Sequence, residues 1–139
     1  MDNLHEQSGS KKVVHMHGEL FKSRCDRCNR PPFDDTNLYD STAEIPRCEC
    51  GGRIRPHFCW FGEVPFELDR IYEALDVCTV FIAVGTSGVV EPAASFVAQV
   101  TDRARTIYVG PEEPANASSF TECYLGKAGE VLRDLLGAL

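Results

Sequence analysis

The sequence contains no long apolar run and no excess of basic residues. No stretch approaches the roughly 20 apolar residues that a membrane-spanning helix needs. Its 14 lysines and arginines are outnumbered by 21 aspartates and glutamates, so the clustered positive charge that nucleic acid calls for is missing. The first residues, MDNLHEQSGSKK, hold no apolar segment typical of a signal peptide. These absences predict a soluble, cytoplasmic protein with no nucleic-acid or membrane partner.

Disulfide bonds are also not expected, although the chain has seven cysteines. In a reducing compartment, paired cysteines bind a metal more often than they form disulfides. Cys25 and Cys28 are spaced C-x2-C, and Cys48 and Cys50 are spaced C-x-C. Each pair can turn its thiolates toward one ion, which predicts a four-thiolate Zn²⁺ site with no open position for a catalytic water. An iron site and a set of unconnected surface thiols are the alternatives.

Composition along the chain predicts one α/β fold interrupted by a small zinc-ribbon module, which we call the cysteine module (residues 21–53). Hydrophobic residues are scarce in this module, so it has too little apolar surface to fold around a core of its own. Residues 1–20 and 54–139 are expected to form the other domain, a partial Rossmann-like sheet with helices. The sequence has no internal repeats and no low-complexity segments.

The apolar pattern indicates alternating strands and helices after the cysteine module. Strands are expected at 13–18, 54–63, 78–85 and 106–110, and helices at 65–77, 91–104 and 129–139. The segment 78–85, CTVFIAVG, is a continuous apolar run, typical of a parallel strand buried on both faces. This order predicts a parallel sheet covered by helices, and such sheets bind ligands at the carboxyl ends of their strands.

Five segments together resemble the sirtuin family in sequence, order and spacing. They are MDNLHEQSG, VVHMHGEL, the cysteine module, RPHFCWFGEVP and VGTSGVVEPAA. Sirtuins are NAD-dependent protein lysine deacylases, and the likeness is to the bacterial branch. The resemblance implies a structural Zn²⁺, NAD as co-substrate and acyl-lysine proteins or peptides as partners. It also implies release of nicotinamide and O-acyl-ADP-ribose.

The catalytic residue implied by the resemblance is His17 in HMHG. Its role would be to deprotonate a ribose hydroxyl of NAD after the acyl oxygen has attacked the cofactor, and histidine suits a base at neutral pH. His15 would share the face of His17 on a regular strand, so spacing alone does not separate the two. Only the match of His-Gly to the family motif selects His17. We interpret His15, His5 and His57 as packing, surface or supporting residues.

The resemblance implies eight residues that contact NAD. They are Asp2, Gly85, Thr86, Ser87, Gly110, Pro111, Glu112 and Ala128. Asp2 matches the nicotinamide-binding cluster, and Ala128 stands at the adenine contact. Residues 85–87 follow an expected strand, where small residues let backbone amides approach a dinucleotide, although a plain turn would have the same sequence. The family has Asn-x-Glu at positions 110–112, so glycine here replaces an asparagine that hydrogen-bonds the adenosine ribose.

Two further segments match the strands between which sirtuins hold the substrate peptide. The implied substrate-binding residues are Cys59, Phe61, Gly62, Glu63, Gly88, Val89 and Val90. Pairing through the peptide backbone tolerates many peptide sequences. Phe61 would line the acyl-lysine tunnel. Cys59 stands where the family usually has valine, and we interpret it as a small packing residue, like Cys78 and Cys123.

Part of the family pattern has no counterpart in the sequence. The glycine-rich phosphate loop is missing, and of the family's Gln-Asn-Ile-Asp only Asp2 is present. The chain therefore resembles the C-terminal half of a sirtuin. We expect weak NAD binding and an unpaired sheet edge, which a second copy or a chain carrying the other half would cover.

Two functions stay open at this point. One is a sirtuin deacylase, whose 139-residue chain alone would show little or no turnover. The alternative is a catalytically inactive half-sirtuin that acts as a zinc-stabilised peptide-binding module. The cysteines alone would also allow a redox or metal-storage protein, but the segments around them argue against it.

Overall fold

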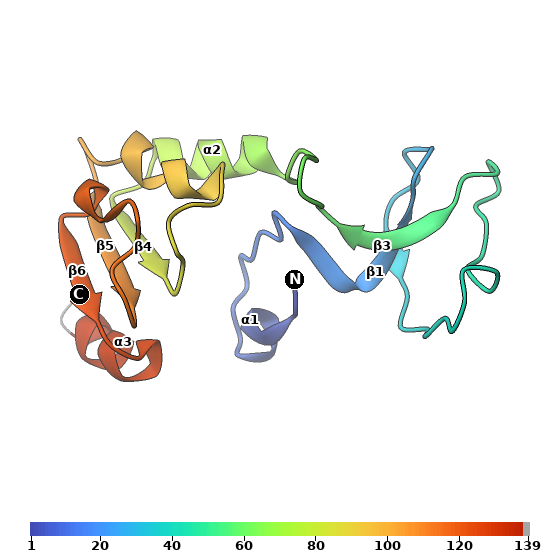
Figure 1. The fold of residues 1–139 in the computed structure, drawn as a ribbon. Coiled ribbons are helices and arrows are strands. Elements are labelled where there is room, and N and C mark those ends of the chain that lie inside the picture. The colour runs from blue at the N-terminus through green and yellow to red at the C-terminus, as the bar shows by residue number, and fades with distance from the viewer. Residues whose placement is uncertain (138–139) are drawn as a thin grey trace. The chain divides into compact units, whose positions relative to one another are not determined.

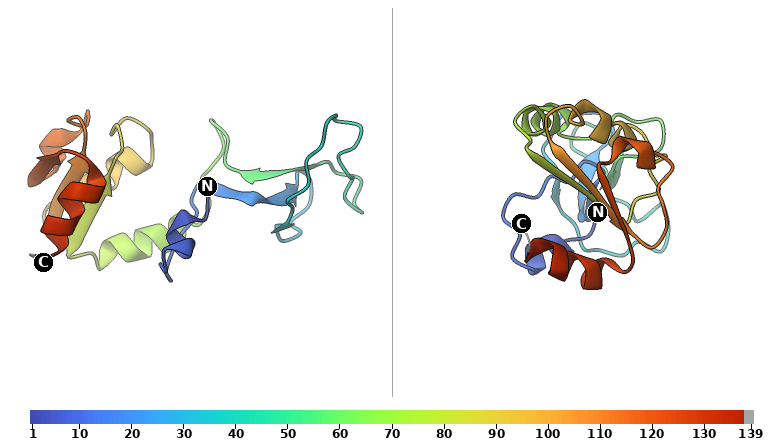
Figure 2. Two further views of the ribbon diagram at one scale, coloured as in Figure 1. Left: turned by 90° about the horizontal axis from the view of Figure 1, so that it is seen from below. Right: turned by 90° about the vertical axis from the view of Figure 1, so that its left-hand side faces the viewer.

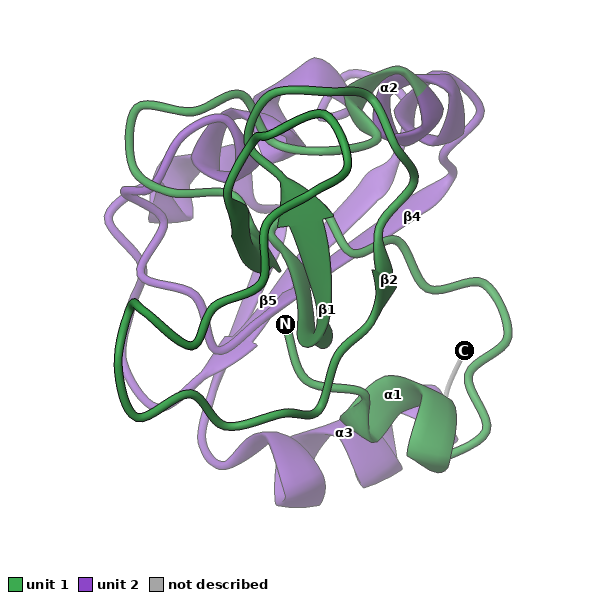
Figure 3. Ribbon diagram, turned by 90° about the vertical axis from the view of Figure 1, so that its right-hand side faces the viewer, with its two compact units in different colours: residues 1–69 green, residues 70–139 purple. Residues whose placement is uncertain are grey.

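The computed structural model describes residues 1–137, which form two compact units (Figures 1 and 3). Unit 1 runs from Met1 to Asp69, and unit 2 begins at Arg70. The sequence predicted a different division, with the cysteine module (21–53) as one domain and residues 1–20 and 54–139 as the other. That division stays a prediction. Within residues 1–137, no helix combines the length and the apolar character that crossing a bilayer would require.

Unit 1 contains a short helix and a three-stranded antiparallel sheet. Helix α1 (Leu4–Gln7) precedes strands β1 (Gly18–Cys25), β2 (Phe33–Asp34) and β3 (Ile54–Phe58), and the sheet order is β2-β1-β3. The core of this unit is small. It consists of Cys25, Cys48 and Ile54, with Cys28, Phe33 and Ile45 packed around them. Three of these six residues are cysteines, so the thiols themselves replace the apolar side chains that the module lacks.

Two strands predicted for unit 1 have different bounds in the structure. The strand expected at 13–18 is wrong, because β1 begins only at Gly18 and then runs into the cysteine module. The residues before it form a turn, in which the Gly18 amide donates to the His15 carbonyl at 2.9 Å. The strand expected at 54–63 ends at Phe58, because the Glu63 amide donates to the Trp60 carbonyl at 2.9 Å and closes a turn.

Unit 2 is built around a parallel sheet. Most of helix α2 (Leu68–Asp76) belongs to this unit, followed by β4 (Val80–Val84), β5 (Arg105–Gly110), β6 (Glu122–Leu125) and helix α3 (Ala128–Leu136). The strand order is β4-β5-β6, and all neighbours are parallel. The predicted α/β fold with a parallel sheet is therefore confirmed. Helix α3 begins one residue earlier than the helix expected at 129–139. Residues 138 and 139 of that expected helix lie outside the described part of the chain.

The core of unit 2 lies on the central strand. Ile107 and Val109 of β5 are fully buried and pack with Leu135 of α3, the helix that packs against β5 (Figures 1 and 2). Apolar residues on one face of α3 complete this cluster, as its helical spacing predicts. At the start of β5, the fully buried Thr106 and its neighbour Thr121 exchange backbone-to-hydroxyl hydrogen bonds of 3.1 and 2.8 Å.

Two predictions for unit 2 are wrong. Strand β4 is not buried on both faces: Val80 and Val84 are 43% and 45% exposed, because β4 stands at the sheet edge within the described residues. The helix expected at 91–104 is replaced by two 3-10 turns, η1 (Ala93–Ser95) and η2 (Val97–Gln99). There the Thr101 hydroxyl donates to the Val97 carbonyl at 2.9 Å, a side-chain bond that competes with helix continuation.

Candidate functional site

Three loops follow the carboxyl ends of the three parallel strands of unit 2. Strand β4 ends at Val84, directly before residues 85–87, and β5 ends at Gly110. Strand β6 ends at Leu125, and its loop leads into α3 at Ala128. Val84 pairs with Val109 next to Gly110, and Gly110 pairs with Leu125, so these ends meet at one edge of the sheet. This is the edge at which open parallel sheets bind ligands.

The loop after β4 is fixed through its backbone. Gly85 has a φ of +65° and donates its amide to the Val109 carbonyl at 2.8 Å. Gly88 has a φ of +70°, and a Cβ there would lie 2.1 Å from Asn116 Oδ1, so only glycine fits. The Ser87 carbonyl accepts the Ala115 amide at 2.9 Å. Thr86 and Ser87 themselves remain exposed, which leaves their polar groups accessible to a ligand.

Tyr108 connects the loops that follow β4 and β5. Its side chain is buried, and its hydroxyl lies 3.1 Å from the Thr86 carbonyl oxygen and 2.9 Å from that of Glu112. A Cβ at Gly110 would lie 2.2 Å from the same hydroxyl oxygen, so no side chain fits at position 110. The Tyr108 hydroxyl therefore accounts for the glycine at position 110, where the family has asparagine. Sequence reasoning missed Tyr108; the available signal was a tyrosine within an apolar strand, whose hydroxyl needs a partner when buried.

The third loop ends at the beginning of α3. The Gly126 amide donates to the Gly110 carbonyl at 2.8 Å, which joins this loop to the end of β5. Ala128 is half-buried and packs against the β5 core. The first amides of α3 have no partner within the helix, and the helix dipole makes this end favourable for negative or polar groups. The predicted contacts of unit 2 with the cofactor thus lie along one sheet edge.

His17 lies in the turn that immediately precedes β1. Its carbonyl accepts the Cys59 amide at 3.2 Å. Gly18 has a φ of +89°, and a Cβ there would lie 1.8 Å from the His57 carbonyl oxygen, so the close approach of β3 requires the glycine that follows His17. Within residues 1–137, no hydrogen bond engages the His17 ring, whereas His15 Nε2 lies 2.6 Å from Glu6 Oε1. The two histidine rings thus have different surroundings, and the catalytic role of His17 stays a prediction.

His57 is half-buried and stacks on the Phe66 ring, with ring centroids 4.4 Å apart. Burial, followed by the positive charge of Arg24, lowers the pKa of His57 below its usual value. Its Nδ1 atom is buried with no hydrogen-bond partner among the described residues. These surroundings favour the neutral ring and a packing role.

The four cysteine sulfurs converge on one point in unit 1. The Cys25 and Cys50 sulfurs are 3.5 Å apart, those of Cys28 and Cys48 are 3.7 Å apart, and all four lie within 4.8 Å of one another. A tetrahedral zinc ion with Zn–S bonds of about 2.3 Å would place its ligands about 3.8 Å apart. A disulfide would require about 2.05 Å. The donors and their spacing therefore fit a structural zinc site, as predicted.

Backbone amides surround the thiols on both sides of this site. The Arg27 amide donates to Cys25 Sγ at 3.3 Å, and the Gly52 amide donates to Cys50 Sγ at 3.4 Å. The amides of Cys28 and Arg27 lower the pKa of Cys25 to about 6. The Gly52 amide lowers that of Cys50, but the neighbouring Cys25 thiolate and burial outweigh it and raise it to about 12. A Cβ at Gly52 would lie 2.6 Å from Cys25 Sγ, which explains the glycine after this pair.

The turn at 59–63 is held by one carboxylate. Glu63 accepts hydrogen bonds from Arg55 Nη2 at 3.1 Å and from the Trp60 amide at 3.0 Å. Arg55, followed by the Trp60 amide, lowers the pKa of Glu63 to about 2. The Arg55 guanidinium also lies over the Trp60 ring, 5.4 Å from its centroid. Cys59 is partly buried, whereas Phe61 at the tip is 98% exposed. The turn thus presents an aromatic side chain to solvent, while the amides of Cys59, Trp60 and Glu63 are engaged within unit 1.

The predicted site residues are divided between the two units. Unit 1 carries Asp2, His17, the four cysteines and residues 59–63, and unit 2 carries the remaining residues implied for NAD and for the peptide. Asp2 accepts the Leu4 amide at 3.1 Å, and this bond lowers the pKa of Asp2. The Met1 carbonyl accepts the Leu20 amide at 2.7 Å, which ties Asp2 to β1. Each unit therefore positions its own share of the site.

A parallel sheet with small-residue loops at its carboxyl edge, combined with a four-thiolate module, defines a Rossmann-like protein with a structural metal site. The model of the Sir2 family matches residues 1–92. Because this match covers more than half of the chain, the protein belongs to the Sir2 family. The predicted resemblance to sirtuins is confirmed.

Individual relatives agree with this assignment. The chain is 43% identical to an NAD-dependent protein deacylase of Shewanella oneidensis, covering all of this chain and 57% of that protein. A solved Sir2 homologue–NAD complex superposes with a TM-score of 0.86 at 36% identity, covering 98% of this chain and 54% of the other. A structure of Sir2 bound to acetylated peptide has a TM-score of 0.80 at 26% identity, covering 98% and 59%. The chain thus spans about half the length of the relatives it matches.

Proposed function

We propose that this chain supplies the catalytic histidine, the zinc module and the adenosine-side loops of an NAD-dependent protein lysine deacylase. The observation that carries the proposal is the His17 ring, held in the turn that Gly18 makes possible and engaged by no hydrogen bond within residues 1–137. The relative from Shewanella oneidensis carries this activity in its name. The proposal includes a cytoplasmic location, where the thiols stay reduced.

The loops at the carboxyl edge of the unit 2 sheet would hold the adenosine end of NAD. Thr86 and Ser87 offer exposed hydroxyls, and the first amides of α3 at Ala128 offer further donors. Gly110, Pro111 and Glu112 would lie beside the adenosine ribose, and the asparagine side-chain contact of the family would be missing at position 110, where the Tyr108 hydroxyl stands. Asp2 would contribute to the nicotinamide end. When bound, NAD supplies the electrophilic ribose carbon of the reaction.

His17 would accept a proton from a ribose hydroxyl of NAD at one of its ring nitrogens. A histidine serves this purpose because it exchanges protons near neutral pH. The zinc ion would take no part in this step, because four thiolates fill its coordination sphere. Its role would be to stabilise the cysteine module.

The substrate in this proposal is an acyl-lysine peptide bound through its backbone. Gly88, Val89 and Val90 and the turn at 59–63 would supply the pairing partners. Val89 and Val90 are 62% and 46% exposed, and Phe61 is available to contact the acyl-lysine side chain. The structure of Sir2 bound to acetylated peptide supports this class of substrate.

A second candidate function is a zinc-stabilised peptide-binding module without turnover. It would bind the peptide through the exposed Phe61, Val89 and Val90 and would not require NAD. In either case we propose that the exposed edge of β4 pairs with a second copy or with a chain carrying the rest of the family fold. Sedimentation that gives a monomer at micromolar concentration would contradict self-association.

The test is release of nicotinamide from NAD in the presence of an acetyl-lysine peptide. We would compare the 139-residue chain with a fusion to the part of the Shewanella oneidensis relative that lies outside its match. We expect robust turnover only from the fusion, and its loss in His17→Ala. His5→Ala, which removes an exposed histidine of the same unit, is the matched control and should retain turnover. Zinc content should be equal in all variants.

The outcomes separate the two functions. Turnover by the fusion that survives His17→Ala would overturn the catalytic assignment. Inactivity of both the chain and the fusion, together with saturable binding of the acetyl-lysine peptide, would favour the peptide-binding module. Robust, His17-dependent turnover by the 139-residue chain alone would show that the phosphate loop is not required.

A further inference from the structure

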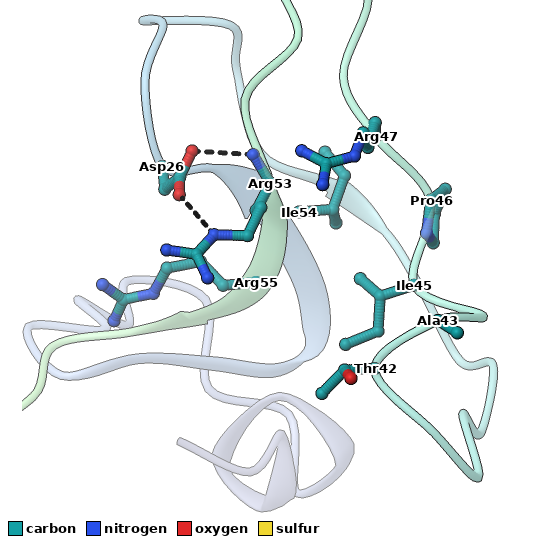
Figure 4. A pocket seen from close by; sticks show the side chains of 9 residues that line it. All are labelled: Asp26, Thr42, Ala43, Ile45, Pro46, Arg47, Arg53, Ile54 and Arg55. Carbon is teal, nitrogen blue, oxygen red and sulfur yellow. Dashed lines mark hydrogen bonds and ion pairs between the residues drawn. The ribbon is translucent and has the colours of Figure 1, made fainter.

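A pocket of about 480 Å³ lies in unit 1, between β3 and the loop that leads to Cys48 (Figure 4). Ile45 and Ile54 form an apolar side of this pocket. Both also belong to the small core around the cysteine sulfurs, which fixes their positions. Arg55, which also holds Glu63 of the turn at 59–63, is the one pocket residue with a place in the proposed deacylase function, so the rest of the pocket requires a separate explanation.

The positive charge of the arginine side chains at this pocket is only partly neutralised by acidic groups. Arg47, Arg53 and Arg55 all line it, against one acid, Asp26. Asp26 is committed to Arg53: it accepts the Arg53 amide at 2.8 Å, and its other oxygen lies 3.5 Å from Arg53 Nε (Figure 4). Arg55 is committed to Glu63. Among residues 1–137, no hydrogen bond or ion pair engages the guanidinium of Arg47.

The backbone forces two of these arginines together. Arg47 and Arg53 face each other across an isolated antiparallel bridge. Like charges directly opposite each other on paired strands are destabilising. Since Asp26 balances only Arg53, the bridge retains one excess positive charge beside the apolar residues. In Figure 4 the Arg47 guanidinium points back toward Ile54 and Arg53. An anion in the pocket would remove the repulsion.

We propose that this pocket binds a carboxylate carried on a short hydrocarbon stem. The Arg47 guanidinium takes the carboxylate, because its planar donors match the two oxygens. Arg53 adds positive charge from the opposite side, and the stem lies on Ile45 and Ile54. A hydrocarbon stem distinguishes this ligand from inorganic phosphate, which would gain nothing from the apolar side and would carry more charge toward Asp26. The carboxylate can belong to a free short-chain acid or to a glutamate side chain of a peptide.

The test is calorimetric titration of the zinc-loaded 139-residue chain with three probes: glutarate, a blocked tripeptide with a central glutamate, and inorganic phosphate. We expect saturable binding of glutarate, of the tripeptide, or of both, and weaker binding of phosphate. Binding of glutarate alone identifies a free acid as the source, and binding of the tripeptide alone identifies an acidic side chain. Both results support the proposal.

Variants of the arginines supply the specificity control. Arg47→Gln should weaken binding by about tenfold or more, since it removes a charge-assisted hydrogen bond. Arg47→Lys should give an intermediate loss. Arg30→Gln removes an arginine of the same module that pairs with Glu49 outside the pocket, and it should bind like wild type. Zinc content of one per chain verifies the fold of each variant.

Three results would overturn the proposal. These are the absence of saturable binding by both carboxylate probes, phosphate binding as tight as that of the better carboxylate probe, and unchanged binding by a zinc-loaded Arg47→Gln or Arg47→Lys chain. None of them depends on NAD or on turnover, so the pocket and the deacylase proposal can fail separately.

Discussion

In unit 1, half of the residues that make up the core are cysteines, whereas in unit 2 the core consists of aliphatic side chains from β5 and α3. The sheet of unit 1 is antiparallel and extends into loops that contain little hydrophobic surface. That of unit 2 is parallel, with fully buried Ile107 and Val109 on its central strand. One chain therefore uses two sources of folding free energy: metal coordination in unit 1 and apolar burial in unit 2.

Because of this difference, the stability of the two units should respond to different chemical changes. A metal-stabilised fold depends on the protonation and oxidation of its thiols, and it is lost when the ion is removed. An apolar core responds instead to the volume of its side chains. Conditions that unfold one unit should leave the interactions that stabilise the other intact.

The largest effect is expected from Cys28→Ser. This change removes one of four zinc ligands, and structural zinc contributes about 10–16 kcal/mol of apparent binding free energy in zinc-finger peptides. We expect one zinc per wild-type chain and, in the variant, loss of zinc with loss of amide protection in unit 1. Protection at Val109 should persist. Elemental analysis and hydrogen exchange measure both effects, and Cys123→Ser is the control. Wild-type protein with well under one zinc per chain would contradict the prediction.

A smaller effect, on unit 2 instead of unit 1, is expected from Ile107→Ala. Truncation of a fully buried isoleucine costs about 2–5 kcal/mol, through lost burial and the cavity left behind. We expect a lower free energy of unfolding for unit 2 in urea, with zinc content unchanged. Val80→Ala, on the exposed edge strand, should change stability much less. Zinc loss in Ile107→Ala would show that the two units do not depend on separate interactions.

The smallest effect is pH-dependent and concerns an ion pair on the unit 2 sheet. Arg105, followed by Tyr124, lowers the pKa of Glu122 to about 2 from 4.5. The folded pKa is depressed, so this stabilisation is fully present above about pH 4.5 and is lost as the pH falls toward 2. Glu122→Gln should therefore melt below wild type at pH 7, and the difference should shrink at pH 3. Methyl NMR signals of Val109 report the melting of unit 2. A difference independent of pH would contradict the prediction.

The sequence predicted the features that depend on local spacing. The cysteine quartet, α2, and the parallel strands around 80–84 and 105–110 all follow from short-range patterns, and the structure confirms them. The order of several motifs predicted the family, which the family match confirms. The roles of the individual site residues stay predictions.

The features that were missed depend on contacts between distant residues. The strand expected at 13–18 is a turn because Gly18 lies against the His57 carbonyl, 39 positions away. The short strand β6 (Glu122–Leu125) has no strong apolar alternation, and its pairing with β5 is supported by the Arg105–Glu122 ion pair. No local pattern shows that the Tyr108 hydroxyl reaches two loops.

Because of the position of the Tyr108 hydroxyl, the residues at positions 108 and 110 cannot be substituted independently of each other. A tyrosine at 108 occupies the space in which any side chain at 110 would begin. Introducing asparagine at 110 alone should therefore displace the Tyr108 hydroxyl. Replacing Tyr108 alone should remove its two links to the loops, while the hydrogen bond between Ser87 and Ala115 remains. A change from Tyr108 with Gly110 to an asparagine at 110 therefore requires substitutions at both positions. Either substitution alone should lower the stability of unit 2.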